Sequence, residues 1–336
     1  MSLTLDLGCT SMGIPVQWCR SDNPHLSILG RSGSGKSYFL RGFIQQAAQQ
    51  GALCLVLDYS ADFRDFSASD GLPFRRIDVT SLDFNINPLA ASAARGGLAA
   101  AQQLLSALHS AFRMGSRANV ALQTATLAYL SQSNNPTLPG LLHYVNAAEK
   151  KSRGLFAAVE PLELLSTLIH CGDRPISIDM EETGIVALGF DQVVDSKFRT
   201  LLVELILQAV WNQWISAGHS ASHPLILVLD ECQNLAWGES SMAVRILREG
   251  RKFGIGGWFA SQWISNKTAV AALGQAALQA NFRPEDANIA ALAKRLAQSE
   301  GTVSQWQGLI RKLKVGQFLC SRQDGKTILV NVPSHQ

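Results

Sequence analysis

The sequence has few residues of the kinds that build metal centres or disulfide frameworks. Its six cysteines, at positions 9, 19, 54, 171, 232 and 320, are scattered. None forms a C-x-x-C pair or lies at metal-ligand spacing from a histidine. This pattern argues against a structural zinc site and against a disulfide-stapled secreted domain. Because no signal peptide is recognisable either, we expect a reducing, cytoplasmic location.

Long apolar runs and strong net charge are also missing. No apolar stretch approaches the roughly 18 residues that suggest a membrane helix, so we expect no membrane span. Charged residues make up 16% of the chain and the net charge is +3, which permits a local basic patch but does not describe a polycation. A hydrophobic content of 47% suits a buried globular core. Internal repeats and low-complexity tracts are absent from the sequence.

What the sequence does contain is a phosphate-binding pattern. Residues 30–37 read GRSGSGKS, which fits the spacing G-x-x-x-x-G-K-[ST] between a short apolar run and a helical segment. Glycines let backbone N–H groups close around phosphates, and the following helix directs its positive end at them. The lysine reaches the β- and γ-phosphates and the serine hydroxyl binds Mg²⁺. The predicted nucleotide-binding residues are Gly30, Arg31, Ser32, Gly33, Ser34, Gly35, Lys36, Ser37 and Tyr38.

Two further apolar runs end in carboxylates, as expected of buried parallel strands that face a ligand crevice. The first, residues 53–58, ends in Asp58, with Asp62 close behind. These two aspartates are candidates for contacts near Mg²⁺ or water, and equally for a helix cap or a turn. The second run ends in Asp230-Glu231. Beside a phosphate loop, Asp230 fits a metal-supporting carboxylate and Glu231 a general base, whereas alone the pair would suit a solvated helix cap.

A basic segment and a polar strand end follow. Arg245, Arg248 and Lys252 share one helical face, which is either a solvated surface or the source of an arginine for a neighbouring subunit's γ-phosphate. Residues 256–262 read as a strand ending in Gln262, whose amide could contact the γ-phosphate or be an ordinary strand-end residue.

The order of patterns predicts an α/β fold with a mostly parallel sheet and helices on both faces. Strands are expected at Arg76–Val79, Ile176–Ile178 and Ile185–Leu188, and a long helix over Phe198–Trp214. We divide the chain into an N-terminal β-hairpin packing on the core (1–25), the first part of the core (26–89), an inserted helical subdomain (90–172), and the remainder of the core with a C-terminal hairpin (173–336).

Other nucleotide-binding classes fit less well. Residues 266–269 read NKTA and lack the aspartate of the guanine-recognition pattern N-K-x-D, and there is no LSGGQ-like stretch of ABC transporter ATPases. A small-molecule kinase stays open, although the Asp230-Glu231 pair favours water as the acceptor.

Together these stretches resemble the HerA/FtsK superfamily of ring-forming ATPases, and HerA most closely. The most specific feature is the run REGRKFG at residues 248–254, followed shortly by Ala260-Ser261-Gln262. The other features that carry the resemblance are residues 30–37, Leu57-Asp58-Tyr59, Asn87-Pro88-Leu89 and Leu229-Asp230-Glu231. The resemblance spans residues 1–332 in motif order, and the inserted helices match only in kind.

The resemblance implies a RecA-like core in a hexameric ring that hydrolyses ATP at subunit interfaces and moves double-stranded DNA through its pore. It also implies a partner nuclease or another effector, including effectors of antiviral defence, because the sequence has no nuclease motif of its own. The roles it assigns are phosphate and Mg²⁺ binding by Lys36 and Ser37, metal support by Asp230, a base in Glu231, a γ-phosphate sensor in Gln262, and a trans arginine in Arg251, with Arg248 and Lys252 as rivals.

The chain departs from the family at its start. HerA proteins begin with a small β-barrel, for which the expected hairpin is too short, and the membrane segments of FtsK and of conjugation coupling proteins are missing. In the family that barrel helps ring assembly and partner docking, so this departure bears on both. The net charge of +3 and the lack of a long basic tract do not require DNA as the partner, and two other functions stay open. One is a nucleotide-gated assembly or sensor subunit that switches a partner effector, and the other is a conjugation or type IV secretion motor.

Overall fold

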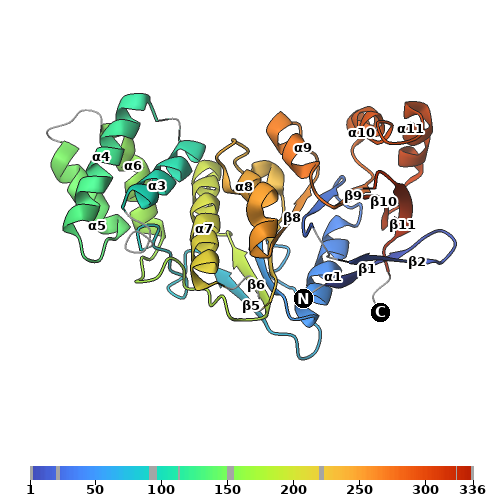
Figure 1. The fold of residues 1–336 in the computed structure, drawn as a ribbon, viewed down its shortest axis with the longest axis horizontal. Coiled ribbons are helices and arrows are strands. Elements are labelled where there is room, and N and C mark those ends of the chain that lie inside the picture. The colour runs from blue at the N-terminus through green and yellow to red at the C-terminus, as the bar shows by residue number, and fades with distance from the viewer. Residues whose placement is uncertain are drawn as a thin grey trace.

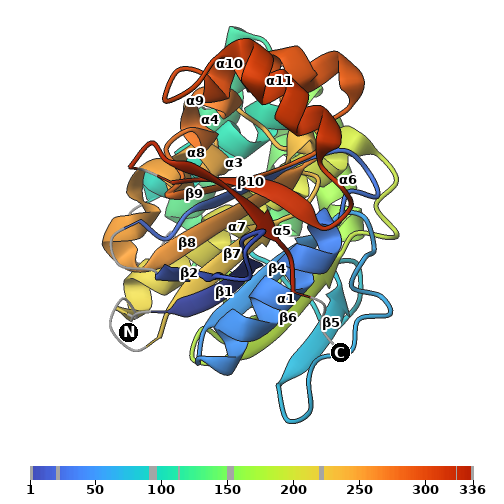
Figure 2. The same ribbon diagram turned by 90° about the vertical axis from the view of Figure 1, so that its right-hand side faces the viewer.

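A single sheet runs through the molecule (Figures 1 and 2). The computed structural model describes residues 3–19, 23–90, 97–112, 114–149, 155–218, 223–322 and 324–333. Its 11 strands follow the order β2-β1-β11-β10-β9-β3-β8-β7-β4-β6-β5. Neighbours from β9 to β5 are parallel, whereas those from β2 to β9 are antiparallel. The predicted mostly parallel α/β fold is therefore confirmed.

The elements alternate along the chain as a parallel sheet requires. The strands are β1 Thr4–Cys9, β2 Pro15–Cys19, β3 Leu26–Leu29, β4 Leu53–Asp58, β5 Phe74–Asp78, β6 Gly184–Gly189, β7 Leu225–Leu229, β8 Ile255–Ser261, β9 Leu278–Phe282, β10 Gln317–Arg322 and β11 Thr327–Asn331. The α-helices are α1 Lys36–Gln49, α3 Gly97–Ala111, α4 Ser116–Gln132, α5 Leu138–Glu149, α6 Phe156–Leu168, α7 Ser196–Ala217, α8 Met242–Glu249, α9 Lys267–Leu273, α10 Ile289–Leu296 and α11 Val303–Lys312.

The central strands are buried on both faces. Along β4, Leu53, Leu55 and Leu57 belong to one hydrophobic core, while Cys54 and Val56 belong to the other. This alternation follows from the two-residue period of a strand and explains why the run is continuously apolar. Helix α1 packs on the second core, and α7 and α8 contribute to the first.

Helices α3 to α6 gather at one end of the molecule (green in Figure 1). Their buried residues, including Leu104, Leu122 and Leu162, lie in the same hydrophobic cluster as Leu201 and Leu205 of α7. The helical region is therefore packed onto the sheet through a continuous core. Residues 91–96 and 150–154, which belong to the predicted helical part, lie outside the described residues.

Two hairpins were predicted and are present, one from β1 and β2 and one from β10 and β11, and β1 joins them by pairing with β11. The predicted strand at Ile176–Ile178 is wrong. Only Ile176 forms a bridge, to Ile86, and the Ser177 hydroxyl instead accepts a bond from the Asn85 backbone N–H. The segment therefore pairs with the loop around residues 85–86 and does not join the sheet. Within the described residues, no helix is both long and apolar enough to cross a membrane.

Candidate nucleotide site

The glycine-rich loop leaves the start of α1 open. The residue that precedes the helix is Gly35, with φ of 102°, and no side chain caps the helix there. A Cβ on Gly35 would lie 3.0 Å from the backbone nitrogen of Gly316, so its left-handed conformation and its close packing both require glycine. An uncapped helix N-terminus behind a glycine-rich turn is a ready site for a phosphate group.

The loop is held by segments far along the chain. The Arg31 N–H donates to the Arg283 carbonyl at 2.9 Å, and the Gly316 N–H donates to the Ser34 carbonyl at 3.0 Å. The buried Ser34 hydroxyl donates to the Arg31 carbonyl at 2.7 Å. These bonds fix the loop before any ligand binds. The sequence reasoning missed both Arg283 and Gly316, because nothing in their local pattern points to residues 30–37.

Lys36 lies within the loop that it is predicted to complete. Its Nζ donates to the Arg31 carbonyl at 2.9 Å, and the side chain is buried. Burial lowers the pKa of Lys36, while the negative charges of Glu231 and Asp230 act in the opposite direction. The ammonium group is thus close enough to both carboxylates to feel them. Burial disfavours the charged ammonium, and an anionic phosphate beside it would stabilise that charged form.

The sheet brings the other predicted residues to the same edge. Strand β8 lies between β3 and β7, and β4 lies beyond β7, all parallel. Their carboxyl ends therefore point the same way and carry the phosphate loop, Gln262, Asp230-Glu231 and Asp58. Gln262 is exposed directly after β8. Carboxyl ends of parallel strands are where ligands bind in open α/β sheets.

Asp230 is a buried carboxylate in a polar setting. Burial raises the pKa of Asp230 to about 6, although its carboxylate accepts hydrogen bonds. The Glu231 N–H donates to its Oδ1 at 2.8 Å, and the Ser60 hydroxyl donates to its Oδ2 at 3.3 Å. A bound cation would stabilise the charged form that burial disfavours. The serine contact was not foreseen, because Ser60 lies in the loop after β4.

Glu231 is positioned through both its backbone and its side chain. Its φ of 48° is left-handed, which is uncommon for a residue other than glycine. Its Oε2 accepts a hydrogen bond from the Gln233 amide, whose Oε1 in turn accepts from the Ser261 hydroxyl at 2.5 Å. Ser261 ends β8 and directly precedes Gln262. A chain of hydrogen bonds thus links the predicted base to the predicted sensor strand, through a glutamine that the sequence reasoning missed.

The structure distinguishes the two aspartates after β4. Asp58 Oδ2 accepts from the Phe63 N–H at 3.3 Å and lies 3.3 Å from Arg76 Nε, so this buried carboxylate organises the turn. Asp62 acts differently, because its charge raises the pKa of both Lys36 and Asp230. Asp62 therefore lies within electrostatic reach of both groups, and Asp58 supports the loop that holds it.

The remaining loop residues vary in exposure. Ser37 is half-buried in the first turn of α1, beside Lys36. Ser32 and Gly33 are exposed at the tip, and Tyr38 is 46% exposed. Within the described residues, no three His, Cys, Asp or Glu side chains converge on a metal position. This donor set fits Mg²⁺ held by Ser37 and Asp230, because Mg²⁺ commonly binds one or two protein groups plus phosphate oxygens and water.

The basic segment lies at the other edge of the sheet. Arg251 belongs to a 3-10 turn, Gly250–Phe253, just before β8 begins. Gln262 follows the other end of that strand, which at about 3.3 Å per residue is roughly 20 Å away. Arg251 therefore does not join the nucleotide site of its own chain.

The cations of this segment, which include Arg248 and Lys252 as rivals of Arg251, differ in their partners. Arg248 forms a 2.6 Å ion pair with Glu239. Arg245 stacks 4.6 Å from the centre of the Trp211 ring and pairs with Glu249, so it is used structurally. Arg251 and Lys252 are exposed, and neither has an ion pair within the part of the chain that the structure describes.

The chain is similar to known proteins in sequence and in fold. Residues 20–209 match the family described as "Helicase HerA, central domain". The structure of VirB4 of Thermoanaerobacter pseudethanolicus superposes with a TM-score of 0.77 at 16% identity, covering 98% of this chain and 96% of that one. No curated protein sequence matches the chain.

A second solved relative is the bacterial conjugative coupling protein TrwB. A form of TrwB in complex with sulphate gives a TM-score of 0.68 at 15% identity, covering 98% of this chain and 90% of that one. TrwB has also been solved with ADP and Mg²⁺, at 14% identity and a TM-score of 0.68, covering 98% of this chain and 89% of that one. At these identities the likeness establishes the RecA-like fold.

Proposed function

Because the chain belongs to the family of HerA helicase central domains, we propose that it is an ATP-hydrolysing ring motor that translocates or unwinds double-stranded DNA. One observation carries the proposal. Lys36 lies close enough to Asp230 and Glu231 for their charges to influence its pKa, although the start of α1 and the turn after β7 are far apart in sequence. A phosphate-binding lysine beside a metal-supporting aspartate and a base is the arrangement that hydrolysis of a phosphoanhydride needs.

The residues divide the reaction among them. The loop N–H groups and Lys36 bind the β- and γ-phosphates, and Lys36 exchanges its bond to the Arg31 carbonyl for phosphate oxygens. Mg²⁺ at Ser37 and Asp230 supplies charge neutralisation on those oxygens when bound. Glu231 accepts the proton of the attacking water, and Gln233 holds its carboxylate in place. Gln262, directly after the adjoining strand β8, would detect the γ-phosphate. That TrwB binds ADP with Mg²⁺ supports ATP and Mg²⁺ as the ligands here.

The test is the ATPase activity of the Glu231→Gln variant. We expect hydrolysis to fall by at least about 100-fold, because the amide cannot accept the proton, while ATP binding stays near that of the natural protein. Lys36→Ala is the matched control, and it should lose ATP binding itself. Equal loss of binding in both variants would contradict the role of Glu231 as base.

The motor role is tested with DNA. We propose that the chain assembles into a hexameric ring, acts in the cytoplasm, and works with a partner nuclease or another effector, including one of antiviral defence. Duplex DNA should then stimulate the ATPase of the assembled oligomer severalfold. An oligomer whose ATPase does not respond to duplex DNA would contradict the translocase proposal and leave a nucleotide-gated switch for a partner protein.

A second candidate is a conjugation or type IV secretion motor. It is supported by the likeness to VirB4 and TrwB, which covers 98% of this chain. Co-purification with membrane complexes, together with stimulation by single-stranded DNA in place of duplex DNA, would favour it.

A further inference from the structure

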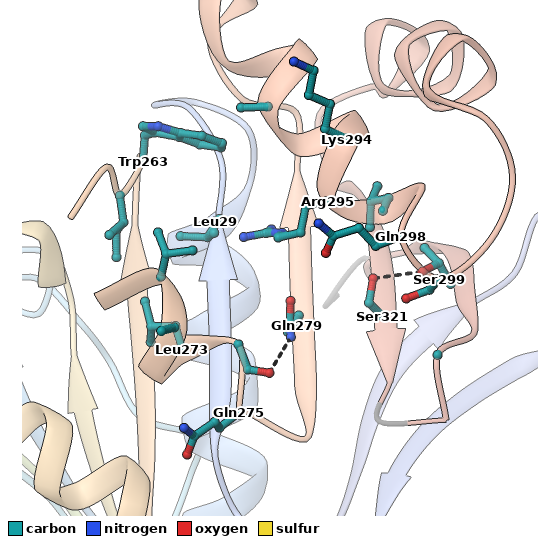
Figure 3. A pocket seen from close by; sticks show the side chains of 18 of the residues that line it. Leu29, Trp263, Leu273, Gln275, Gln279, Lys294, Arg295, Gln298, Ser299 and Ser321 are labelled. Atoms are coloured by element: carbon teal, nitrogen blue, oxygen red, sulfur yellow. Dashed lines mark hydrogen bonds between the residues drawn. The ribbon is translucent and has the colours of Figure 1, made fainter. Parts of the chain in front are cut away.

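A cavity of about 860 Å³ lies over the sheet between α9 and α10, and no role has been assigned to it above (Figure 3). Leu29 of β3, Gln279 of β9 and Ser321 of β10 lie along its floor. Leu273 and Trp263 form one side, and Arg295 of α10 enters from the other. Its size is within the range of small-molecule sites, about 300–1,000 Å³.

The charged side chains that line this cavity are all of one sign among the described residues. They are Lys294, Arg295 and Arg322. Lys294 points away from the cavity, and the Arg322 guanidinium donates to the Gln17 carbonyl at 2.9 Å. Arg295 is therefore the cation that the cavity presents to a ligand.

Arg295 lacks a compensating charge. Its guanidinium donates to the neutral Asn281 amide oxygen at 2.5 Å, and its buried Nε has no hydrogen-bond partner among the described residues. Burial lowers the pKa of Arg295, with no opposing contribution from a carboxylate. Elsewhere the chain treats a partly buried guanidinium differently, since Arg76 is paired with both Asp58 and Asp191. A desolvated cation without a counter-ion is costly, and an anion that entered the cavity would remove that cost.

The opposite side of the cavity is apolar. Trp263 and Leu273 face the guanidinium across the space, and Leu29 lies on the floor between them (Figure 3). We propose that this cavity binds a small organic anion in which a phosphate or carboxylate meets Arg295 and an attached flat or apolar group packs against Trp263. Arginine presents a planar fork that suits both kinds of oxyanion, so the two are distinguished by experiment.

The site adjoins the nucleotide site without being part of it. Leu29 directly precedes Gly30, and Trp263 directly follows Gln262. The Trp263 carbonyl lies 3.2 Å from the Ser261 hydroxyl, which bonds to Gln233. A ligand against Trp263 would thus lie next to the end of β8, where Ser261 bonds to the glutamine that holds the Glu231 carboxylate. Binding does not depend on hydrolysis, so it can be tested whether or not the chain is an ATPase.

The experiment is calorimetric titration of the full chain, saturated with ADP and Mg²⁺, with phenyl phosphate, benzoate and neutral benzamide as probes. We expect one or both anions to bind in the millimolar range, as is usual for ligands of this size, and benzamide to bind at least about tenfold more weakly. Binding of phenyl phosphate alone would identify a phosphate site, and binding of benzoate alone a carboxylate site.

Variants locate the binding. Arg295→Met should lower the affinity for the anion at least about tenfold. Lys294 is the neighbouring cation that points away, and Lys294→Met should change this affinity less than about threefold. If Arg295→Met fails to fold, Ala291→Trp provides an independent test, because it fills the cavity from α10 without removing the guanidinium. Three results would overturn the proposal. The first is an anion affinity that is unchanged in both Arg295→Met and Ala291→Trp. The others are benzamide binding as tight as that of the anions, and no binding of either anion up to about 10 mM.

Discussion

At the scale of single residues, the site is set by how the chain holds Glu231. A left-handed backbone costs a non-glycine residue of the order of 1 kcal/mol or more. Here it is stabilised by the bond from the Glu231 N–H to Asp230 and by the bond from Gln233 to the carboxylate. The two acidic side chains of one dipeptide thereby have different hydrogen-bond partners, which suits the proposed roles of Asp230 beside a cation and Glu231 beside water.

Replacing Gln233 tests whether this contact positions the base. In Gln233→Leu, the Glu231 carboxylate loses its partner and samples other rotamers, so we expect kcat to fall by about tenfold with little change in KM for ATP. Steady-state ATPase kinetics give both constants. Ser261→Ala, which removes only the far end of the chain of bonds, is the control and should have a smaller effect. A rise in kcat would mean that Gln233 restrains the base instead of positioning it.

Asp230 makes cation binding depend on pH. Its pKa of about 6 in the folded protein lies above its ordinary value of 3.8, because burial disfavours the charge. Protons therefore compete with Mg²⁺ below pH 6, and the gain in ADP affinity that Mg²⁺ provides should decline by up to about tenfold per pH unit there. Titration calorimetry with and without Mg²⁺ between pH 5 and 7.5 measures it. In Asp230→Asn the nucleotide phosphates still titrate but residue 230 does not. If the gain in ADP affinity due to Mg²⁺ declined equally steeply with falling pH in that variant, the pH dependence would not come from Asp230.

At the scale of elements, α7 and α8 are joined by a buried carboxylate. Glu204 of α7 accepts a hydrogen bond from the Met242 N–H at 3.1 Å, where α8 begins. Burial raises the pKa of Glu204 to about 7, from an ordinary value of 4.5. The bond caps a helix terminus, but ionisation of the group at neutral pH is unfavourable in this setting.

The Glu204→Gln variant should separate the two effects. Below pH 4.5 the carboxyl is protonated in both folded and unfolded chains, so its charge does not affect stability. As the pH rises to 7 the unfolded chain ionises first, and the natural protein loses stability, fully above pH 7. Glutamine keeps an acceptor for Met242 and has no charge. We expect the variant to be more stable at pH 8, by up to about 3 kcal/mol, and near-equal at pH 4. Urea unfolding at both pH values measures this, and a variant less stable at pH 8 would contradict it.

The sequence was most informative where one strand carries its own signal. The apolar runs ending at Asp58 and Leu229 predicted buried parallel strands, and the motif order predicted the HerA/FtsK superfamily, both confirmed. Contacts between distant segments could not be predicted in this way. Gly316 packs on the phosphate loop, and Ser261 donates to Gln233, only because the sheet order brings these segments together. No strand, helix or site residue was predicted between residues 263 and 314, although β9 pairs directly with β3 and α10 provides Arg295.

At the scale of the whole molecule, the nucleotide site and the basic turn lie at opposite edges of the sheet. Arg251 precedes β8, whereas Gln262 follows it. A parallel sheet of this size does not allow one chain to bring both to the same nucleotide. In a closed ring, however, each subunit presents one surface to the next, and the two edges come from different chains. The isolated chain should then be a poor ATPase whose specific activity rises with protein concentration.

Mixing two inactive variants tests this arrangement. Lys36→Ala lacks the phosphate-binding lysine, and Arg251→Ala lacks the arginine proposed to act in trans, so each alone should hydrolyse ATP at least about 100-fold more slowly than the natural protein. In a random one-to-one mixed ring, about a quarter of the interfaces combine an intact Lys36 with an intact Arg251 from the neighbour, and activity should recover toward that fraction. Arg248→Ala, paired with Glu239 in the structure, serves as the comparison and should keep more activity alone. No recovery in rings shown to be mixed by mass photometry would mean that Arg251 does not complete a neighbour's site.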